Sequence, residues 1–321
     1  MLVPSRILVT GAGGFVGRTL LPTLRTAFPA ATLIGAGREA FITGADESLR
    51  LDLLDPAGMS AAIAAAQPDA VLHLAAQADV AASFRIPAET WRLNLLGTLA
   101  LAEAVLQEAP KAVFLHVSSS EVYGLSFQAG QPLDEAAAFQ PTSPYAASKA
   151  AADLAIGEMA LRGLRAIRLR PFTHVGPGQS PNFAVASFAR QVARIEAGRQ
   201  EPVLRTGALD RWRDILDVRD ICAGYVQALR MADRLPPGLA LNLCSGEPRR
   251  ISGILDALLA LAGIEAQIER EAARLRPTDV ERVEGNPARA CDVLGWAPTI
   301  PWEETLRSIL GDWRNRVAAG E

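Results

Sequence analysis

The chain has few cysteines, and those it has stand far apart. Cys222, Cys244 and Cys291 are the three cysteines among 321 residues. No two of them have the spacing of a metal-ligand pair, and an odd number does not suit a disulfide framework. We therefore expect no metal site, and we expect these residues to serve as small buried apolar side chains.

The sequence also lacks long apolar runs and a strong charge of either sign. No stretch of about 20 apolar residues is free of charge, so the pattern predicts no membrane span. The N-terminus enters a strand without the basic and apolar regions of a signal peptide. The formal net charge of −3 gives no support for binding to nucleic acid or to a membrane surface. We expect a cytoplasmic protein.

Half of the residues are hydrophobic, which is enough for a sizeable core. In the first half, short β-rich runs alternate with alanine-rich helical stretches. This alternation predicts βαβ units in an α/β fold, a doubly wound parallel sheet of the Rossmann type. The expected strands are 6–10, 31–36, 70–74, 112–118, 164–170 and 239–244. The expected helices are 14–27, 56–66, 88–108, 144–161, 183–197, 251–262 and 302–316.

The composition changes after Pro171, where loops that contain glycine and proline become frequent. This change indicates a second, smaller unit beside the parallel sheet. We expect a nucleotide-binding domain over 1–172, to which 214–244 returns. The segments 173–213 and 245–321 are then expected to form a smaller substrate-binding lobe.

A glycine-rich turn follows the first expected strand and opens the first expected helix. Its glycines have the spacing G-x-x-G-x-x-G. Such a turn allows a tight bend, close approach of the backbone to phosphate, and close packing of helix on strand. The start of the helix can then bind the pyrophosphate of a dinucleotide. The residues expected to contact the cofactor here are Gly11, Gly14, Phe15, Val16 and Gly17.

The end of the second strand bears on the choice of cofactor. A site that prefers NAD usually has a carboxylate there for the ribose diol, and the run 32–38 ends without one. Arg38 can instead meet a 2′-phosphate, so we expect NADP(H) to be preferred, with NAD(H) as the alternative. Residues after later strands should complete the cofactor site. They are Asp52 and Leu53, near the adenine, and Leu74, Ala75 and Ala76.

Two segments predict proton transfer beside this cofactor. Tyr145 and Lys149 are four residues apart, which places both side chains on one face of a helix. A cation beside a phenol favours phenolate, so this spacing predicts a lowered tyrosine pKa and acid/base chemistry. Ser119 follows the strand 112–118, where its hydroxyl can bond a substrate oxygen.

These motifs together resemble the extended short-chain dehydrogenase/reductase family that acts on nucleotide sugars. The resemblance covers essentially the whole chain. It implies that Tyr145 is the general acid/base, that Lys149 activates it and binds the ribose, and that Ser119 is the third member. The motifs that carry it are Gly11–Gly17, Asn94, Ser118–Gly124, Tyr145-x-x-x-Lys149, Arg170–Phe172, Arg213–Asp214, Asp217–Asp220 and Leu294–Pro298.

Within this family, the segments 170–180, 211–214 and 276–279 resemble the GDP-6-deoxy-D-mannose reductases. The resemblance implies hydride transfer from NAD(P)H to C4 of a GDP-4-keto-6-deoxyhexose, giving GDP-D-rhamnose. Thr173 stands where that group usually has asparagine, and it keeps one hydroxyl but loses the amide's fork of donor and acceptor. Arginine forks suit the diphosphate. The expected substrate contacts are Ser120, Thr173, His174, Asn182, Arg213 and Arg276.

Two other functions remain open on the same motifs. Glu121 stands where the related nucleotide-sugar 4,6-dehydratases have the base that removes the C5 proton. The reductases also carry glutamate there, so Glu121 does not separate the two, although Ser120 offers no acid for a leaving hydroxyl. A 4-epimerase uses the same scaffold. A non-catalytic Rossmann protein that binds nucleotide is the alternative from another class.

The resemblance also implies an oligomer. In the family, helices equivalent to 88–108 and 141–161 pair across a two-fold axis into a four-helix bundle. Both segments are rich in alanine here, which allows close helix approach. We expect a homodimer.

Overall fold

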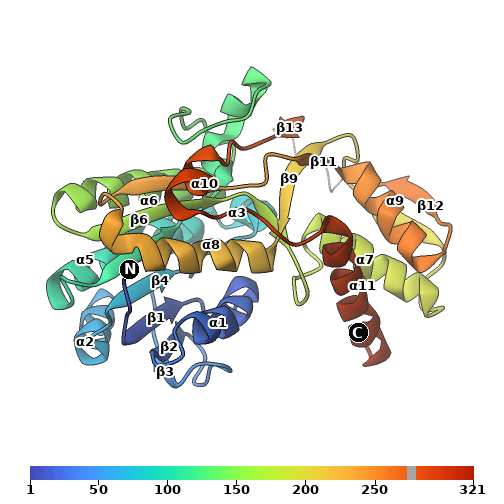
Figure 1. Cartoon of the computed structure of the whole chain (residues 1–321). Helices are drawn as coiled ribbons and strands as arrows, with labels where there is room; N and C mark the ends of the chain where they lie inside the picture. The colour runs from blue at the N-terminus through green and yellow to red at the C-terminus, as the bar shows by residue number, and fades with distance from the viewer. Residues whose placement is uncertain (273–279) are drawn as a thin grey trace.

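The computed structural model describes residues 1–272 and 280–321, so the expected Arg276 lies outside the described residues. A seven-stranded parallel sheet in the order β3-β2-β1-β4-β5-β6-β10 forms its centre (Figure 1). The strands are β1 (Arg6–Thr10), β2 (Thr32–Gly37), β3 (Glu47–Arg50), β4 (Ala70–His73), β5 (Val113–Val117), β6 (Arg165–Pro171) and β10 (Leu239–Leu243).

The strand order reverses direction between β1 and β4. From β1 the chain moves outward to β2 and β3, and it then crosses back to β4, β5 and β6 on the other side. Thr10 pairs with His73, and His73 pairs with His116, so the carboxyl ends of these strands lie level. A reversal of this kind opens a crevice at the carboxyl edge of the sheet. The doubly wound fold expected from the sequence is confirmed.

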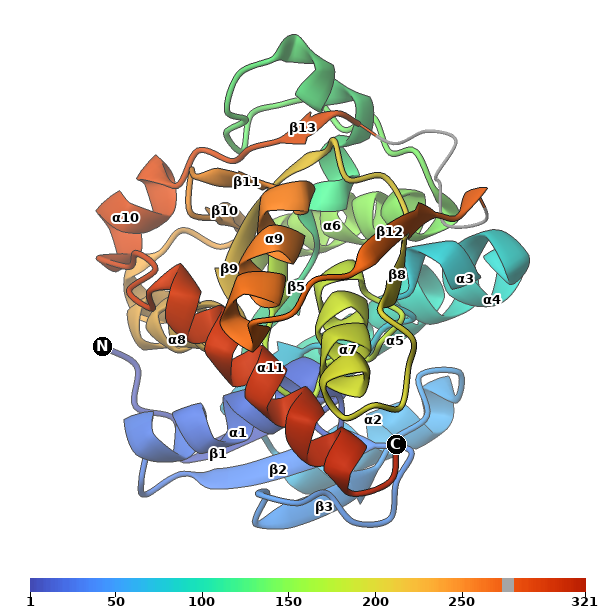
Figure 2. The ribbon, with the colours of Figure 1, turned by 90° about the vertical axis from the view of Figure 1, so that its right-hand side faces the viewer.

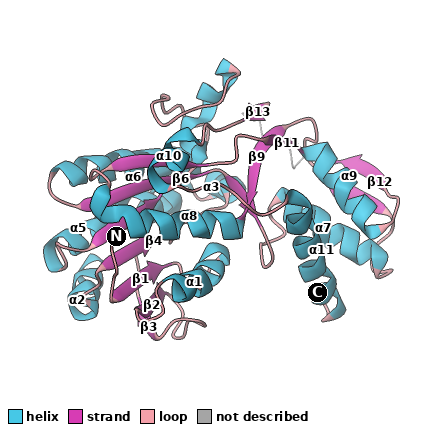
Figure 3. Cartoon of the chain, in the orientation of Figure 1, coloured by secondary structure: helices cyan, strands magenta, loops and turns pink. Residues whose placement is uncertain are grey.

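Helices cover both faces of the sheet (Figure 3). The helices on one face share a core cluster, and they are α1 (Phe15–Ala27), α8 (Val218–Met231) and α10 (Ala288–Leu294). Those on the other face are α2 (Pro56–Ala66), α5 (Thr98–Glu108) and α6 (Pro144–Leu161). Because both faces are covered, the central strands β1, β4 and β5 read as apolar runs rather than as alternating patterns.

The expected helix 88–108 is helical but not regular. The chain there forms α4 (Pro87–Trp91), a π-helical turn η1 (Arg92–Gly97) and then α5. The buried Asn94 lies in this π turn, where its amide donates to the Gln77 carbonyl at 3.0 Å and to Ser148 Oγ at 3.1 Å. The wide turn thus directs one polar side chain toward the loop after β4 and toward α6, as π turns at functional sites often do.

A second group of elements lies beside the carboxyl edge of the large sheet (Figures 1 and 2). Strands β11, β9 and β13 form a small sheet to which β7 adds, and β12 pairs with β8. Three helices pack around a separate core, and they are α7 (Ala184–Glu196), α9 (Ile251–Ala262) and α11 (Trp302–Ala318). The strands are β7 (Thr173–Val175), β8 (Val203–Thr206), β9 (Trp212–Asp217), β11 (Pro248–Arg250), β12 (Gln267–Arg270) and β13 (Arg282–Val283).

Three short helical segments complete the described chain, and they are α3 (Val80–Arg85), η2 (Ser120–Ala129) and η3 (Ala232–Arg234). Cys222 and Cys244 are buried as expected, whereas Cys291 is partly exposed. Within residues 1–272 and 280–321, no helix combines the length and apolar character that crossing a membrane requires.

A buried carboxylate joins the small sheet to two loops. Asp214 of β9 is fully buried and accepts hydrogen bonds from the Ser245 amide at 2.9 Å and the Ser245 hydroxyl at 2.6 Å. The Gly246 amide donates to it at 2.9 Å and the Gly285 amide at 3.4 Å. Both the turn after β10 and the chain after β13 therefore depend on one side chain.

We predict that Asp214→Ala lowers the free energy of unfolding by about 3 kcal/mol, because it leaves one buried and three partly buried donors without this acceptor. Urea denaturation measures this loss. Asp210→Ala is the matched control, since Asp210 is exposed and pairs with Arg211 and Arg270 at the surface. An equal effect of the two variants would contradict the structural role of Asp214.

Candidate active site

At two positions of the turn after β1, neighbouring backbone atoms leave no space for a side chain, so glycine is required there. Gly11 has φ of +68°, and a Cβ there would lie 2.9 Å from the Ala75 amide nitrogen. A Cβ on Gly17 would lie 2.4 Å from the Ala12 carbonyl oxygen. The first glycine brings the end of β4 against the turn, and the second allows α1 to pack on it. A turn that binds a dinucleotide needs both of these close approaches.

The start of α1 is open to an anion. Gly14 is its N-cap, and in the described chain no side chain bonds the first amides of the helix. The first turn also contains no acidic residue. Unpaired amides at a helix N-terminus, together with the helix dipole, favour phosphate. The turn and helix therefore fit the pyrophosphate of NAD(P).

A positive and a negative side chain follow directly after β2. Arg38 is exposed there, as the sequence suggested. The next residue, Glu39, was missed as a site residue. Its carboxylate lies over the turn, since a Cβ on Gly37 would be 2.7 Å from Glu39 Oε2 and one on Gly13 would be 3.6 Å from the same carboxylate. The sequence could have indicated this residue, because it is a carboxylate only two residues beyond the strand, where we expected none.

The structure brings Ser119, Tyr145 and Lys149 together at the carboxyl end of β5. Ser143 caps α6 by accepting the Ala146 amide at 3.0 Å, so the helix begins just before Tyr145. Ser119 lies close enough to Tyr145 for its hydroxyl to act on the phenol. The Lys149 ammonium donates to the carbonyl of Val117, the last residue of β5. Three of the four side chains expected to be catalytic therefore lie together, and the fourth, Glu121, lines the pocket described next.

Desolvation shifts the pKa values of this group, in which Lys149 is buried and Tyr145 is half-buried. Burial raises the pKa of Tyr145 to about 12, and the Glu121 carboxylate adds to that rise, while the nearby Ser119 hydroxyl opposes it. Burial lowers the pKa of Lys149 to about 8 against the attraction of Asp153. The lowered tyrosine pKa that we expected is therefore wrong for the free protein. Desolvation is the largest influence on the tyrosine, and the Lys149 ammonium is directed at a backbone carbonyl instead.

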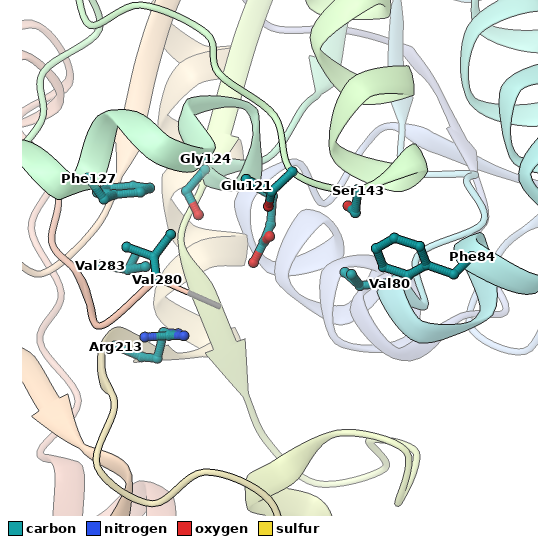
Figure 4. Close-up of a pocket in the computed structure, with 11 residues that line it drawn as sticks. Val80, Phe84, Glu121, Gly124, Phe127, Ser143, Arg213, Val280 and Val283 are labelled. Carbon is teal, nitrogen blue, oxygen red and sulfur yellow. The ribbon is translucent and has the colours of Figure 1, made fainter. Parts of the chain in front are cut away.

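A pocket of about 500 Å³, open solvent at its mouth included, is lined by Ser120 and Ser143, which are close in the chain to Ser119 and Tyr145 (Figure 4). Glu121 reaches into it from η2, and Arg213 reaches into it from β9 (Figure 4). A carboxylate and a guanidinium therefore enter it from opposite sides. Val80 and Phe84 of α3 form an apolar wall that sequence reasoning missed. The remaining lining residues are Gly124, Phe127, Thr142, Val280 and Val283.

The other expected substrate residues lie around the pocket rather than in its lining. Thr173 is exposed on β7. His174 is stacked on Phe15 with ring centroids 6.2 Å apart, and its Nδ1 donates to the Phe172 carbonyl at 2.9 Å. Asn182 donates to the Asp79 carboxylate at 3.3 Å, across the gap between α3 and α7. Their substrate contacts stay predictions.

The expected adenine contacts are also outside the pocket. Asp52 is exposed, and its carboxylate accepts the Leu54 amide at 2.9 Å. Leu53 is nearly buried against η1, since a Cβ on Gly97 would lie 2.8 Å from Leu53 Cβ. The chain at Leu74 to Ala76 is partly exposed beside the glycine turn. These positions suit an adenosine site, which stays a prediction.

A family model and a relative of known function both match nearly the whole chain. The family model described as GDP-mannose 4,6 dehydratase matches residues 8–309. The GDP-6-deoxy-D-mannose reductase of Pseudomonas aeruginosa is 39% identical over 313 residues, which are 97% of this chain and 98% of that protein.

Solved structures agree. RMD from Pseudomonas aeruginosa, complexed with NADPH, has a TM-score of 0.85 and 37% identity, and covers 97% of this chain and 98% of that one. The UDP-glucose 4-epimerase of Thermus thermophilus, in complex with NAD, has a TM-score of 0.83 and 28% identity, and covers 96% of this chain and 99% of that one. The chain thus shares one fold with proteins solved with either nicotinamide cofactor.

The raised tyrosine pKa can be tested without any ligand. The chain has three tyrosines. Burial raises the pKa of Tyr123 and of Tyr145 to about 12, and it raises the pKa of Tyr225 well above its usual value. We predict that no tyrosinate absorbance appears in the ultraviolet below about pH 10. One equivalent that appears near neutral pH, and that Tyr145→Phe removes, would show instead that Lys149 lowers the tyrosine pKa in the free protein.

Proposed function

The chain belongs to the GDP-mannose 4,6 dehydratase family, and we propose that within this family it is an NADPH-dependent reductase of a GDP-4-keto-6-deoxyhexose, producing GDP-D-rhamnose. The observation that carries the proposal is a protonated Tyr145 close to Ser119, both near in the chain to the residues Ser120 and Ser143 that line a pocket with Arg213. The likeness to the Pseudomonas reductase over nearly all of both chains supports it. NADH is the alternative cofactor.

The chemistry of the site follows from its protonation. When bound, NADPH supplies the hydride that reduces the C4 carbonyl. Tyr145 gives its proton to O4, on which negative charge develops, and the Ser119 hydroxyl stabilises the same oxygen. Below about pH 8 the Lys149 ammonium is charged and can bind a ribose hydroxyl. A tyrosine that stays a phenol at neutral pH suits reduction, because reduction consumes a proton.

We assign substrate binding to the elements around the small sheet. Arg213 enters the pocket from β9, and its planar fork suits a diphosphate better than a lysine would. The apolar wall from α3 suits a 6-deoxy sugar, which carries a methyl group at C6. In this proposal the substrate lobe comprises 173–213 and 245–321, and 214–244 returns to the domain of 1–172. The three scattered cysteines suit a reducing cytoplasm.

Arg38 is our candidate for the 2′-phosphate of NADPH, since it is exposed directly after β2. The neighbouring Glu39 carboxylate suits the ribose hydroxyls of NADH and would repel a 2′-phosphate that came close to it. The two charges favour different cofactors, so we expect NADPH to be preferred over NADH by a modest margin.

A 4,6-dehydratase is the second candidate, because the Glu121 carboxylate enters the pocket as a base would have to. The two functions differ in what happens to the cofactor. A dehydratase returns the hydride to its own substrate, whereas a reductase uses one NADPH in each turnover.

The deciding experiment follows NADPH oxidation in the presence of GDP-4-dehydro-6-deoxy-D-mannose, with a dTDP-keto-sugar and GDP-mannose as controls. We expect one NADPH oxidised for each GDP-keto-sugar consumed, and no oxidation with the controls. Conversion of GDP-mannose to a keto-sugar without added cofactor would assign the protein to the dehydratases instead.

Loss of the phenol proton should reduce turnover and spare binding. We predict that Tyr145→Phe lowers kcat by about 10²–10⁴-fold, the usual contribution of general acid catalysis. The Kd of NADPH, measured by its fluorescence, should change little. Retention of more than a tenth of kcat would mean that another group protonates O4.

We further propose that the protein is a homodimer through the helices at 88–108 and 141–161. Large apolar side chains remain exposed on these helices. They are Trp91, Leu96, Leu154 and Leu161, which are 37%, 57%, 61% and 89% exposed. Exposed apolar side chains gathered on one face are typical of protein interfaces.

We predict that Leu154→Arg converts a dimer into a monomer in sedimentation velocity, because it places a charge within an apolar interface. Phe41→Arg is the matched control, since Phe41 is 74% exposed but lies between β2 and β3. A wild-type chain that sediments as a monomer at micromolar concentration would refute the dimer.

A further inference from the structure

The helix that carries Tyr145 and Lys149 also carries a buried carboxylate with no part in the proposed reaction. Asp153 follows Lys149 by four residues, and it is fully buried. It accepts hydrogen bonds from Arg168 Nη1 at 2.9 Å, from Arg170 Nε at 3.0 Å and from Arg170 Nη2 at 2.9 Å. Both arginines lie on β6, where alternate residues face the same side of the sheet. Asp153 therefore ties α6 to β6.

Arg170 extends this connection to the segment after β5. Its Nη1 donates to the Tyr123 hydroxyl at 2.9 Å and to the Glu135 carbonyl at 3.0 Å. The Tyr123 hydroxyl donates in turn to Asn242 Oδ1 on β10 at 2.7 Å. Since Tyr123 is two residues from Glu121, one buried network joins the helix of the catalytic pair to the turn that lines the pocket.

The network places three cations on one side of the sheet. Arg168, Arg170 and Lys149 all face α6 or belong to it, and Lys149 is only 3% exposed. Arginine does not lose its proton in proteins, whereas a buried lysine does so readily. If the counter-charge of Asp153 were removed, the lysine is therefore the cation that would give up its proton.

Other titratable groups near Lys149 do not replace this counter-charge. His73 of β4 and His116 of β5 face the same region, and burial lowers the pKa of both, so they are neutral. Tyr145 is also neutral because its pKa is raised to about 12. Glu121 acts on Tyr145 from η2, on the pocket side.

We propose that Asp153 is a positioning residue for the Tyr145–Lys149 pair. It fixes α6 against β6 and η2, and it supplies the negative charge that balances the buried cations around Lys149. This inference rests on the proposed reductase function only for its kinetic consequence, because the charge on the lysine is a property of the free protein.

The test uses the fact that Lys111 and Lys149 are the only lysines in the chain. Protein labelled with ¹³Cε-lysine gives two signals, which Lys111→Met assigns. The Lys149 signal should titrate near pH 8 in the wild type. In Asp153→Asn, which keeps the shape but removes the charge, the midpoint should fall by about one pH unit or more.

The matched control is Asp233→Asn. Asp233 also binds an arginine of β6, Arg165, at 2.9 Å, but the two side chains are 45% and 38% exposed. This variant should leave the Lys149 midpoint unchanged. If both variants move it equally, or neither does, Asp153 has no specific effect on the lysine and the proposal fails.

The kinetic consequence separates positioning from a purely structural role. If the Lys149 cation supports turnover, kcat falls as the pH rises through the lysine pKa. In Asp153→Asn this decline should move to lower pH by the same amount as the NMR midpoint. A variant that only lost stability would show less activity at every pH with an unchanged decline. Failure of all keto-sugar reduction would refute the reductase but would leave the NMR result intact.

A second variant keeps the proposal testable if Asp153→Asn does not fold. Arg168→Met removes one of the cations, and the Arg168 side chain is 18% exposed, so the change leaves less buried space unfilled. With one positive charge fewer, the Lys149 midpoint should rise above 8. A midpoint that stays or falls in this variant would overturn the electrostatic argument.

Discussion

The level pairing of four parallel strands is the constraint on which the rest of the structure depends. Because β1, β4, β5 and β6 run in one direction and in one register, the glycine turn, the end of β4 and Ser119 emerge at the same edge. No strand supplies a whole site, and each contributes one end. The helix α6 then needs only to lie against β5 and β6 for Tyr145 and Lys149 to reach that edge.

Water exclusion at this edge has opposite effects on the two titrating side chains. It disfavours the anionic form of Tyr145 and the cationic form of Lys149, so it raises one pKa and lowers the other. A single cause therefore produces a neutral phenol and a lysine that titrates near working pH. The buried Asp153 favours the ammonium form, so it limits the decrease in the Lys149 pKa.

Local patterns were enough to predict the parts of the site that depend on neighbours in sequence. The glycine spacing predicted the turn, and the spacing of Tyr145 and Lys149 predicted one helix face, because φ angles and helix geometry act over a few residues. The π turn at Asn94, the tyrosine pKa and the position of Glu39 escaped prediction. Each depends on burial or on contacts between segments far apart in the chain. Local patterns in the sequence carry no information on either.

The acids and bases present in the pocket suit reduction better than dehydration. Dehydration across C5 and C6 needs a base for the C5 proton and an acid for the leaving hydroxyl, in addition to the tyrosine. Of the described lining residues, Glu121 is the one carboxylate, and the neighbouring Ser120 is a buried hydroxyl. Reduction needs only a proton donor at O4. An anion beside Tyr145 raises the tyrosine pKa, so Glu121 favours the protonated phenol that this donor must be.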